Sequence, residues 1–310
     1  MPAQAPSHTP VMVDEALRCL RPRSGGLYVD ATVGLGGHSA AILDAAGGGA
    51  RLIGIDQDPG ALDIAQQRLR PYGPAVTLVE ANFADLDAAL DEVGETDADG
   101  ILMDIGMSSY QIEDSGRGFS FARDEPLDMR MNPETELTAA DVVNRYRQED
   151  LEGLIREYGE ERWARRIARA VVEQRRQRPL RTSRQLANLI EGVTPGSARR
   201  RRHPATRTFQ ALRICVNDEL ASLRRGLDLA LERLRPDGTL CVIAFHSLED
   251  RIVKRRFRAA AESPAPTYEL LTKRPMTAED EVLDNPRARS AKLRAIRRAP
   301  TSGNADDPES

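Results

Sequence analysis

Short apolar runs alternate with amphipathic stretches through the first third of the chain. Four runs, each bounded by Gly, Asp or Pro, are typical of buried strands: Leu27–Ala31, Arg51–Asp56, Val76–Glu80 and Gly100–Ile105. Apolar positions at helical spacing mark the segments between them: Ser39–Ala46, Pro59–Leu69 and Phe83–Val93. Asp58 directly before Pro59 is typical of a helix start. This alternation predicts βαβ units and a parallel sheet.

The alternation stops at about residue 112 and resumes only after Pro204. The interval contains helical patterns, such as Trp163, Ile167 and Val171 on one face with arginines on the other. We expect a long helix over about Phe209–Leu234, followed by a strand at Thr239–Phe245. The pattern of residues 292–298 predicts a last strand. We therefore expect an α/β fold, a mostly parallel sheet with an inserted all-helical domain.

The predicted boundaries divide the chain into four parts. Residues 1–111 and 209–300 form the sheet domain, 112–208 form the helical insert, and the polar segment 301–310 is a disordered tail. The N-terminus has no basic region followed by an apolar one, and the longest apolar stretch is too short to span a membrane. Three widely spaced cysteines predict neither a disulfide framework nor a metal cluster, as in a cytoplasmic protein without a metal.

Charge is distributed unevenly over these parts. Residues 1–161 hold 12 Lys/Arg against 30 Asp/Glu, whereas 162–213 hold 15 Arg against 2 acidic residues. Four consecutive arginines lie at the end of this basic segment: Arg199, Arg200, Arg201 and Arg202. Arginine pairs bidentately with phosphate, so the insert is a candidate surface for a polyanion. A run of this kind is equally typical of a solvated helix face.

A glycine-rich turn follows the first predicted strand. Its sequence from Asp30 to His38 includes Gly34, Gly36 and Gly37, which let the backbone turn sharply and approach a ligand. The glycines are too crowded for the G-x-G-x-x-G spacing of dinucleotide sites. An adenosine cofactor without a pyrophosphate fits better, and S-adenosylmethionine, with its positive sulfonium, suits the nearby Asp30 and Asp104.

Two further residues favour an adenosine ligand over an empty turn. Asp56 ends the second predicted strand, where a carboxylate accepts hydrogen bonds from ribose hydroxyls. Phe83 follows the third strand, where its ring can pack against adenine. These positions predict a cofactor site at the carboxyl end of the sheet.

The loop after the fourth strand, Asp104–Gln111, lies at the same predicted edge. Asp104 can accept a hydrogen bond from an exocyclic amine of a base, and Tyr110 can stack on that base. Methylation at cytosine C5 requires an activated thiolate, and none of the three cysteines lies in a predicted loop. The residues thus indicate transfer to an exocyclic nitrogen or to a ribose hydroxyl.

His246 follows the fifth strand and is open to two interpretations, a substrate contact or a hydrogen bond to backbone. The next residues predict a capping box between Ser247 and Asp250 for a helix that carries Arg251, Lys254 and Arg255.

Eight segments, in this order, resemble the bacterial 16S rRNA cytosine-N4 methyltransferases of the RsmH/MraW family. They are His8–Val11 (HTPV), Asp30–Ser39 (DATVGLGGHS), Asp104–Gln111 (DIGMSSYQ), Arg117–Phe121 (RGFSF), Pro126–Met131 (PLDMRM), Tyr158–Glu161 (YGEE), His203–Leu212 (HPATRTFQAL) and Phe245–Lys254 (FHSLEDRIVK). The resemblance covers nearly the whole chain. It departs at Tyr110, where the family usually has Pro.

The resemblance implies a Rossmann-like class I methyltransferase that uses S-adenosylmethionine, with these cofactor contacts: Gly36, Gly37, His38, Asp56, Phe83, Asp104 and Gln111. It implies methylation of N4 of a decoding-centre cytidine, position 1402 of 16S rRNA in the small ribosomal subunit. Candidate RNA contacts are Tyr110, His246 and the arginines 199–202, and Asp104 is the candidate catalytic residue, as a base or only to orient the amine. Homodimer formation is left open.

Three other functions remain to be weighed against this one. A DNA amino-methyltransferase of the same fold is disfavoured by the segments beyond the glycine turn. A non-catalytic RNA-binding or ribosome-assembly factor would bind the cofactor without turnover. A nicotinamide oxidoreductase is opposed by the glycine spacing.

Overall fold

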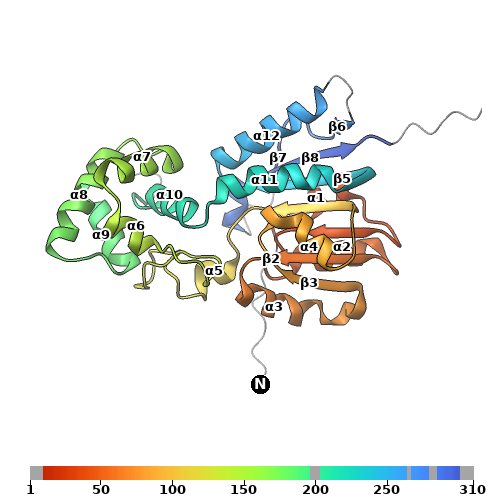
Figure 1. Ribbon diagram of the computed structural model, residues 1–310, viewed down its shortest axis with the longest axis horizontal. Helices are drawn as coiled ribbons and strands as arrows, with labels where there is room; N and C mark the ends of the chain where they lie inside the picture. The colour runs from red at the N-terminus through yellow and green to blue at the C-terminus, as the bar shows by residue number, and fades with distance from the viewer. Residues whose placement is uncertain (1–9, 196–202, 264–266, 279–284, 301–310) are drawn as a thin grey trace, which may run out of the picture. The chain divides into compact units, whose positions relative to one another are not determined.

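The computed structural model describes residues 10–195, 203–263, 267–278 and 285–300 (Figure 1). The predicted tail and the four consecutive arginines at 199–202 lie outside the described residues. The chain folds into two compact units. The sheet unit comprises Met1–Gly106 and Ser222–Ser310, and the helical unit comprises Met107–Ala221.

The sheet unit is built on one mixed sheet with strand order β3-β2-β1-β4-β5-β8-β6, and β7 pairs with β8. Its parallel strands are β1 (Leu27–Asp30), β2 (Arg51–Asp56), β3 (Val76–Glu80), β4 (Ala98–Asp104) and β5 (Leu234–Ala244). The antiparallel pairings involve β8 (Lys292–Arg298), β6 (Tyr268–Leu270) and β7 (Met276–Thr277). The predicted parallel, Rossmann-like sheet is confirmed. Of the strands in the described residues, the short β6 and β7 were not predicted.

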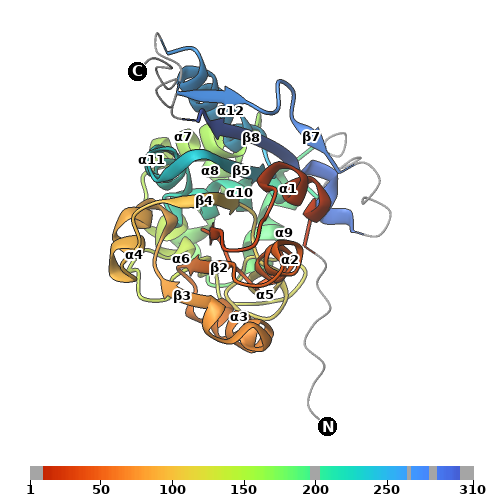
Figure 2. The same cartoon turned by 90° about the vertical axis from the view of Figure 1, so that its right-hand side faces the viewer.

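Alternate residues of each strand enter two different cores, which explains the continuous apolar runs. Along β4, Ile101 and Met103 join one cluster while Leu102 joins the other. The first cluster is covered by α4 (Leu86–Glu92), α11 (Glu219–Glu232) and α12 (Ser247–Ala261). The second face is covered by α1 (Val13–Leu20), α2 (Gly37–Ala46) and α3 (Pro59–Leu69) (Figure 2).

Helix starts follow the local chemistry of the sequence. Asp58 caps α3, because its Oδ1 accepts the backbone N–H of Gly60 at 3.2 Å and Pro59 occupies the first helical position. Short 3₁₀ turns are η1 (Arg70–Ala75), η2 (Phe83–Asp85) and η5 (Pro286–Ser290). The helix predicted over Phe83–Val93 is therefore divided into η2 and α4.

The helical unit contains α5 (Ser109–Glu113), α6 (Ala139–Arg145), α7 (Gln148–Gly159), α8 (Ala164–Gln177), α9 (Ser183–Val193) and α10 (Thr206–Val216). Its core is a separate cluster that includes Ile155, Ile167, Leu186 and Leu212. Within its described residues, the only β pairing is the isolated bridge between Pro126 and Thr182. Because α10 belongs to this core, the unit extends beyond the predicted range of 112–208.

The prediction of one long helix over Phe209–Leu234 is wrong. The chain forms α10 and α11 instead, separated at Asn217 and at Asp218, whose φ of 47° is left-handed. A left-handed residue ends an α-helix because its backbone cannot continue the hydrogen-bond ladder. Among the described residues, no helix is long and apolar enough to cross a membrane.

Candidate active site

The turn after β1 lies where the strand order reverses, between β1 and β4. Gly34 and Gly36 have φ of 49° and 76°, in the left-handed region that glycine adopts without strain. A Cβ added to Gly36 would lie 3.1 Å from Leu69 Cγ, and one on Gly37 would lie 2.8 Å from Pro10 Cγ. The turn therefore requires glycine both for conformation and for space, at the place where open α/β sheets bind ligands.

Asp30, the last residue of β1, stabilises this turn by hydrogen bonds. Its side chain is buried, Oδ2 accepts the Ser39 hydroxyl at 2.7 Å, and Oδ1 accepts the Thr32 N–H at 3.3 Å. Burial raises the pKa of the Asp30 carboxyl, although nearby His38 opposes that shift. Both oxygens thus have partners within the turn, so Asp30 acts on the shape of the site.

Asp56 ends β2 and is half-buried beside the same turn. Its Oδ2 accepts the Gly34 N–H at 2.9 Å, and its Oδ1 accepts the Asp58 N–H at 3.0 Å. Burial raises the pKa of Asp56 to about 6, against the two backbone hydrogen bonds that lower it. Each carboxylate oxygen has a second lone pair, which is the acceptor capacity that a ribose hydroxyl needs.

Asp104 ends β4, next to β1 in the sheet. Its backbone N–H donates to Thr32 Oγ1 at 2.7 Å, and its Oδ2 lies 3.4 Å from Nε2 of the buried His38. Its other oxygen, Oδ1, is buried and accepts no hydrogen bond from any residue that the structure describes. A buried acceptor without a donor is costly, and such a group is typical of a site that completes its hydrogen bonds with a ligand.

Phe83 lies in η2, after β3, and is half-buried against the core of the sheet unit. Asn82 fixes the start of this turn, since its Oδ1 accepts the Ala84 N–H at 2.9 Å. A Cβ on Gly226 of α11 would lie 2.6 Å from Phe83 Cδ2, so a larger residue at position 226 would clash with the Phe83 ring. The predicted ring is thus held at the same edge of the sheet as the glycine turn.

His246 and Glu249 form the cap at the start of α12. His246 Nδ1 accepts the Glu249 N–H at 3.4 Å, and Glu249 Oε2 accepts the N–H groups of Phe245 at 2.8 Å and His246 at 3.1 Å. His246 Nε2 also lies 2.9 Å from Glu249 Oε1. The predicted capping box between Ser247 and Asp250 is wrong by one residue, because a histidine ring nitrogen replaces the expected hydroxyl.

Two predicted contacts, Gln111 and Tyr110, belong to the helical unit. Gln111 is buried and forms a capping box with Ser108, with Oε1 accepting the Ser108 N–H at 3.1 Å. The Arg117 guanidinium lies 5.8 Å from the centre of the Tyr110 ring. Both side chains thus have local structural contacts.

The arginines that precede the basic run in the sequence, from Arg175 to Arg184, differ in their surroundings. Arg175 donates to the carbonyls of Val143 and Tyr146 at 2.8 and 2.7 Å, which is a structural role. Arg184 donates to the carbonyl of Ala122 at 2.9 Å, whereas Arg176, Arg178 and Arg181 are exposed. His203, at the end of the run, stacks on Phe121 with 4.3 Å between ring centres.

The family model for the MraW methylase family matches residues 5–299. The chain belongs to this family. It is 51% identical over 304 residues to the ribosomal RNA small subunit methyltransferase H of Symbiobacterium thermophilum, covering 93% of this chain and 96% of that one. The protein of the same description from Geobacter sulfurreducens is also 51% identical, covering 93% of this chain and 98% of that one. The predicted family resemblance is confirmed, and the protein is a methyltransferase.

Solved structures resemble this methyltransferase only distantly. A putative rRNA methylase from Clostridium thermocellum matches with a TM-score of 0.45 and 10% identity, covering 94% of this chain and 99% of that chain. The fold assignment therefore rests on the strand order and pairing of the sheet itself.

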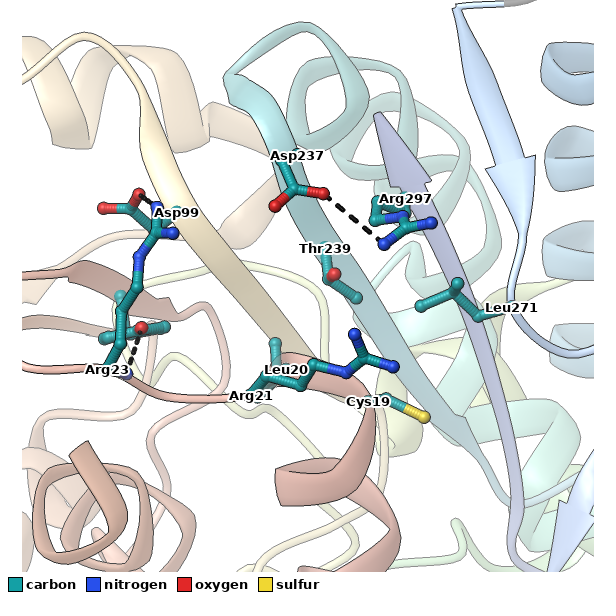
Figure 3. A pocket seen from close by; sticks show the side chains of 10 residues that line it. Cys19, Leu20, Arg21, Arg23, Asp99, Asp237, Thr239, Leu271 and Arg297 are labelled. Atoms are coloured by element: carbon teal, nitrogen blue, oxygen red, sulfur yellow. Dashed lines mark hydrogen bonds and ion pairs between the residues drawn. The ribbon is translucent and has the colours of Figure 1, made fainter. Parts of the chain in front are cut away.

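The three cysteines differ in their surroundings: Cys19 and Cys241 belong to the sheet unit and Cys215 to the helical unit of this methylase. Cys241 is buried within β5, and burial raises its pKa well above the usual value. Cys215 lies in α10, and burial raises its pKa as well. Cys19 lines a pocket of about 190 Å³ beside Arg21 and Asp99 (Figure 3). That pocket lies at the amino ends of the parallel strands, opposite the glycine turn, so Cys19 is not placed beside that turn.

The sequence did not single out three contacts that shape the site: Ser39 to Asp30, Thr32 to Asp104, and His38 to Asp104. All three join the turn after β1 to an acidic residue at a strand end. Ser39, Thr32 and His38 belong to the segment that carried the resemblance. The two contacts to Asp104 follow from the pairing of β1 with β4, which a single sequence does not display. The contact between Ser39 and Asp30 depends on the fold of the turn itself.

Proposed function

We propose that this protein methylates the N4 amine of a cytidine in small-subunit rRNA, with S-adenosylmethionine as the methyl donor, in the cytoplasm. The curated relatives that match over 93% of the chain are described as small-subunit rRNA methyltransferases, which supports the substrate class. The observation that carries the chemistry is Asp104 Oδ1, a buried acceptor that receives no donor from the described residues.

The residues of the sheet unit fit an adenosine cofactor. A Cβ at Gly36 or Gly37 would come too close to Leu69 or Pro10, so the turn packs tightly and carries no side chain at these two positions. Asp56, at the end of β2, would accept the ribose hydroxyls, and Phe83 would pack against the base. When bound, S-adenosylmethionine supplies an electrophilic methyl group on a positively charged sulfur. The site contributes Asp30 and Asp104 as acids near that charge.

Asp104 would act on the amine of the target base. A cytosine amine has its lone pair delocalised into the ring, and an acceptor on one N–H orients that nitrogen for in-line attack. Asp104 has one oxygen beside His38 Nε2 at 3.4 Å and the other without a donor among the described residues, so it can hold the amine by the second oxygen. We assign Asp104 this orienting contact.

The target base must reach the carboxyl end of the sheet, so we propose an unpaired or flipped cytidine. The arginines at 199–202 remain the proposed phosphate contacts of the helical unit, which position the RNA while the residues around Asp104 select the base. Tyr110 remains a proposed stacking residue. His246 is instead assigned to the cap of α12, where both ring nitrogens face Glu249.

The test is methyl transfer from labelled S-adenosylmethionine to isolated small subunits and to protein-free rRNA, followed by nucleoside mass spectrometry. We expect N4-methylcytidine; a C5 or ribose product, or cofactor binding without any product, would contradict the proposal.

Asp104→Asn removes the negative charge but keeps an oxygen and the size of the side chain. We expect kcat to fall by about 10²-fold, since a small misplacement of the attacking group costs about that much in rate. Asp63→Asn, on the exposed face of α3, is the matched control and should leave kcat unchanged. Equal rates for the Asp104 variant and the native protein would remove Asp104 from the mechanism.

A further inference from the structure

A stripe of basic side chains runs along the exposed face of α12. The basic stripe consists of Arg251, Lys254, Arg255 and Arg258, all exposed. Their spacing of i, i+3, i+4 and i+7 places them on one side of the helix, over a rise of about 10 Å. Four adjacent cations on one rigid element form a surface of a kind that binds phosphates.

The opposite side of α12 is fixed in the core of the sheet unit. Glu249, Val253 and Phe257, at i, i+4 and i+8, are 1%, 1% and 2% exposed. Arg256, between the two sides, pairs with Asp228 of α11. The packing therefore sets which side of the helix faces solvent, and it holds the basic stripe outward.

The charges at the centre of the basic stripe are not compensated. Lys254 and Arg255 form no ion pair with any residue in the part of the chain that the structure describes. Arg258 is near Glu262 at 3.6 Å, with both side chains largely exposed, so solvent screens that pair. Asp250, the nearest acid at the helix start, is already neutralised by Arg294 at 2.7 Å and Lys292 at 3.4 Å.

The start of α12 lies at the same edge of the sheet as the candidate site. His246 lies two residues after the end of β5, and β5 is paired with β4 up to Ile243 opposite Asp104. The basic stripe thus begins one helical turn from the strand end beside Asp104. The basic stripe and the strand end that carries Asp104 are therefore on the same side of the sheet unit.

We propose that the basic stripe of α12 is an rRNA-binding surface of the sheet unit, which contacts phosphates near the target cytidine. This inference rests on the proposed function and adds a second set of phosphate contacts, separate from the arginines of the helical unit. The contacts are independent of base identity because guanidinium and ammonium groups bind phosphate oxygens.

The experiment compares the native full-length protein with Lys254→Gln/Arg255→Gln in binding to a transcript of the decoding region of 16S rRNA, over a range of salt concentrations. Two lost phosphate contacts should reduce the slope of log K against log salt by about 1.4 for a single strand. If both proteins bind equally at 1 M salt, this corresponds to roughly 25-fold weaker binding at 0.1 M salt. The KM for RNA should rise, whereas kcat and the affinity for S-adenosylmethionine should stay unchanged.

Arg23→Gln/Arg51→Gln is the matched control, with the same change in net charge. These arginines lie at the amino ends of β1 and β2, where they pair with Asp99 and Glu95. The control should keep the native salt slope. If both double variants keep the native salt slope, the proposal for α12 is wrong. If both lower the slope equally, net charge alone determines RNA affinity, and the proposal is also wrong. A native protein that binds and methylates no RNA would instead contradict the proposed function.

Discussion

The carboxylates around the glycine turn differ in what their oxygens accept. Asp30 is occupied by Ser39 and Thr32, Asp56 by the backbone of Gly34 and Asp58, and Asp104 keeps one oxygen without a donor among the described residues. Their different surroundings assign different roles to one residue type. Asp30 stabilises the turn after β1, Asp56 connects that turn to the start of α3, and Asp104 keeps the acceptor that we propose for the substrate amine.

The raised pKa of Asp56 makes stability depend on pH. Its folded pKa is about 6 against an ordinary value of 3.8, so between these values the folded protein binds more protons than the unfolded chain. The carboxyl therefore favours the folded state at low pH, and this advantage is lost as pH rises through about 6. At neutral pH the buried charge costs roughly 3 kcal/mol.

Asp56→Asn removes this titration. We expect the free energy of unfolding of the variant, relative to the native protein, to rise by roughly 2 kcal/mol between pH 4 and pH 7. Urea unfolding at a series of pH values measures it, with Asp63→Asn as the control for losing a carboxylate. A difference that stays constant over this range would show that Asp56 is not perturbed by burial.

Residue types and their chain positions in the site were predictable from the sequence, but their partners were not. Asp104 and the glycines were identified because they follow strand patterns. The hydroxyl of Thr32 on the Asp104 backbone could not be, because that contact exists only when β1 and β4 are neighbours. Tyr110 and Gln111 show the same limit, since their contacts to Arg117 and Ser108 depend on the folded loop.

At the scale of elements, the start of α12 depends on one buried carboxylate. Glu249 is 1% exposed, accepts two backbone N–H groups and lies beside His246. A charged acceptor that satisfies helix-end donors contributes more than a neutral one. The sequence predicted a cap in this segment but assigned it to Ser247, because serine is the commoner capping residue.

Glu249→Ala should lower the free energy of unfolding by about 2–3 kcal/mol, since it leaves buried donors without an acceptor. Glu249→Gln keeps one acceptor oxygen and should cost less. Ser247→Ala is the control, and should have little effect if His246 is the capping residue. Thermal unfolding of the three variants distinguishes the two caps, and a larger loss for Ser247→Ala would restore the cap first predicted.

The strands show why most elements were predicted correctly. The runs at β1, β2 and β3 are short, apolar and bounded by glycine or acidic residues, so their ends are visible in the sequence. The break between α10 and α11 is not, because Asn217 and Asp218 interrupt no apolar pattern. The β5 strand begins earlier than predicted, at Leu234, since its register with β4 shifts around Pro236-Asp237-Gly238.

At the scale of the molecule, two units have separate cores. The clusters of the sheet unit contain residues such as Ile101 and Leu223, and the cluster of the helical unit contains Leu186 and Ile155. A unit with its own core can lose stability without the other.

Leu186→Ala should therefore destabilise the helical unit alone. Leu186 is fully buried, and a cavity of this kind costs about 2–5 kcal/mol. Hydrogen exchange followed by mass spectrometry should show faster exchange in α6 to α10, with unchanged exchange in β1 to β5 and unchanged cofactor affinity. Leu223→Ala is the reciprocal variant in the sheet unit. Faster exchange throughout both units in either variant would show that they unfold as one.

The sequence by itself determined the alternation of strands and helices, the glycine turn, the uneven charge and the family. These depend on local periodicity and on residue types at fixed spacing, which a chain carries before it folds. Only the tertiary structure decided that His246 caps a helix, that Asp104 keeps a buried oxygen without a donor among the described residues, and that four cations of α12 face outward together. Those properties depend on which segments become neighbours, and burial then sets the pKa and the hydrogen bonds of each group.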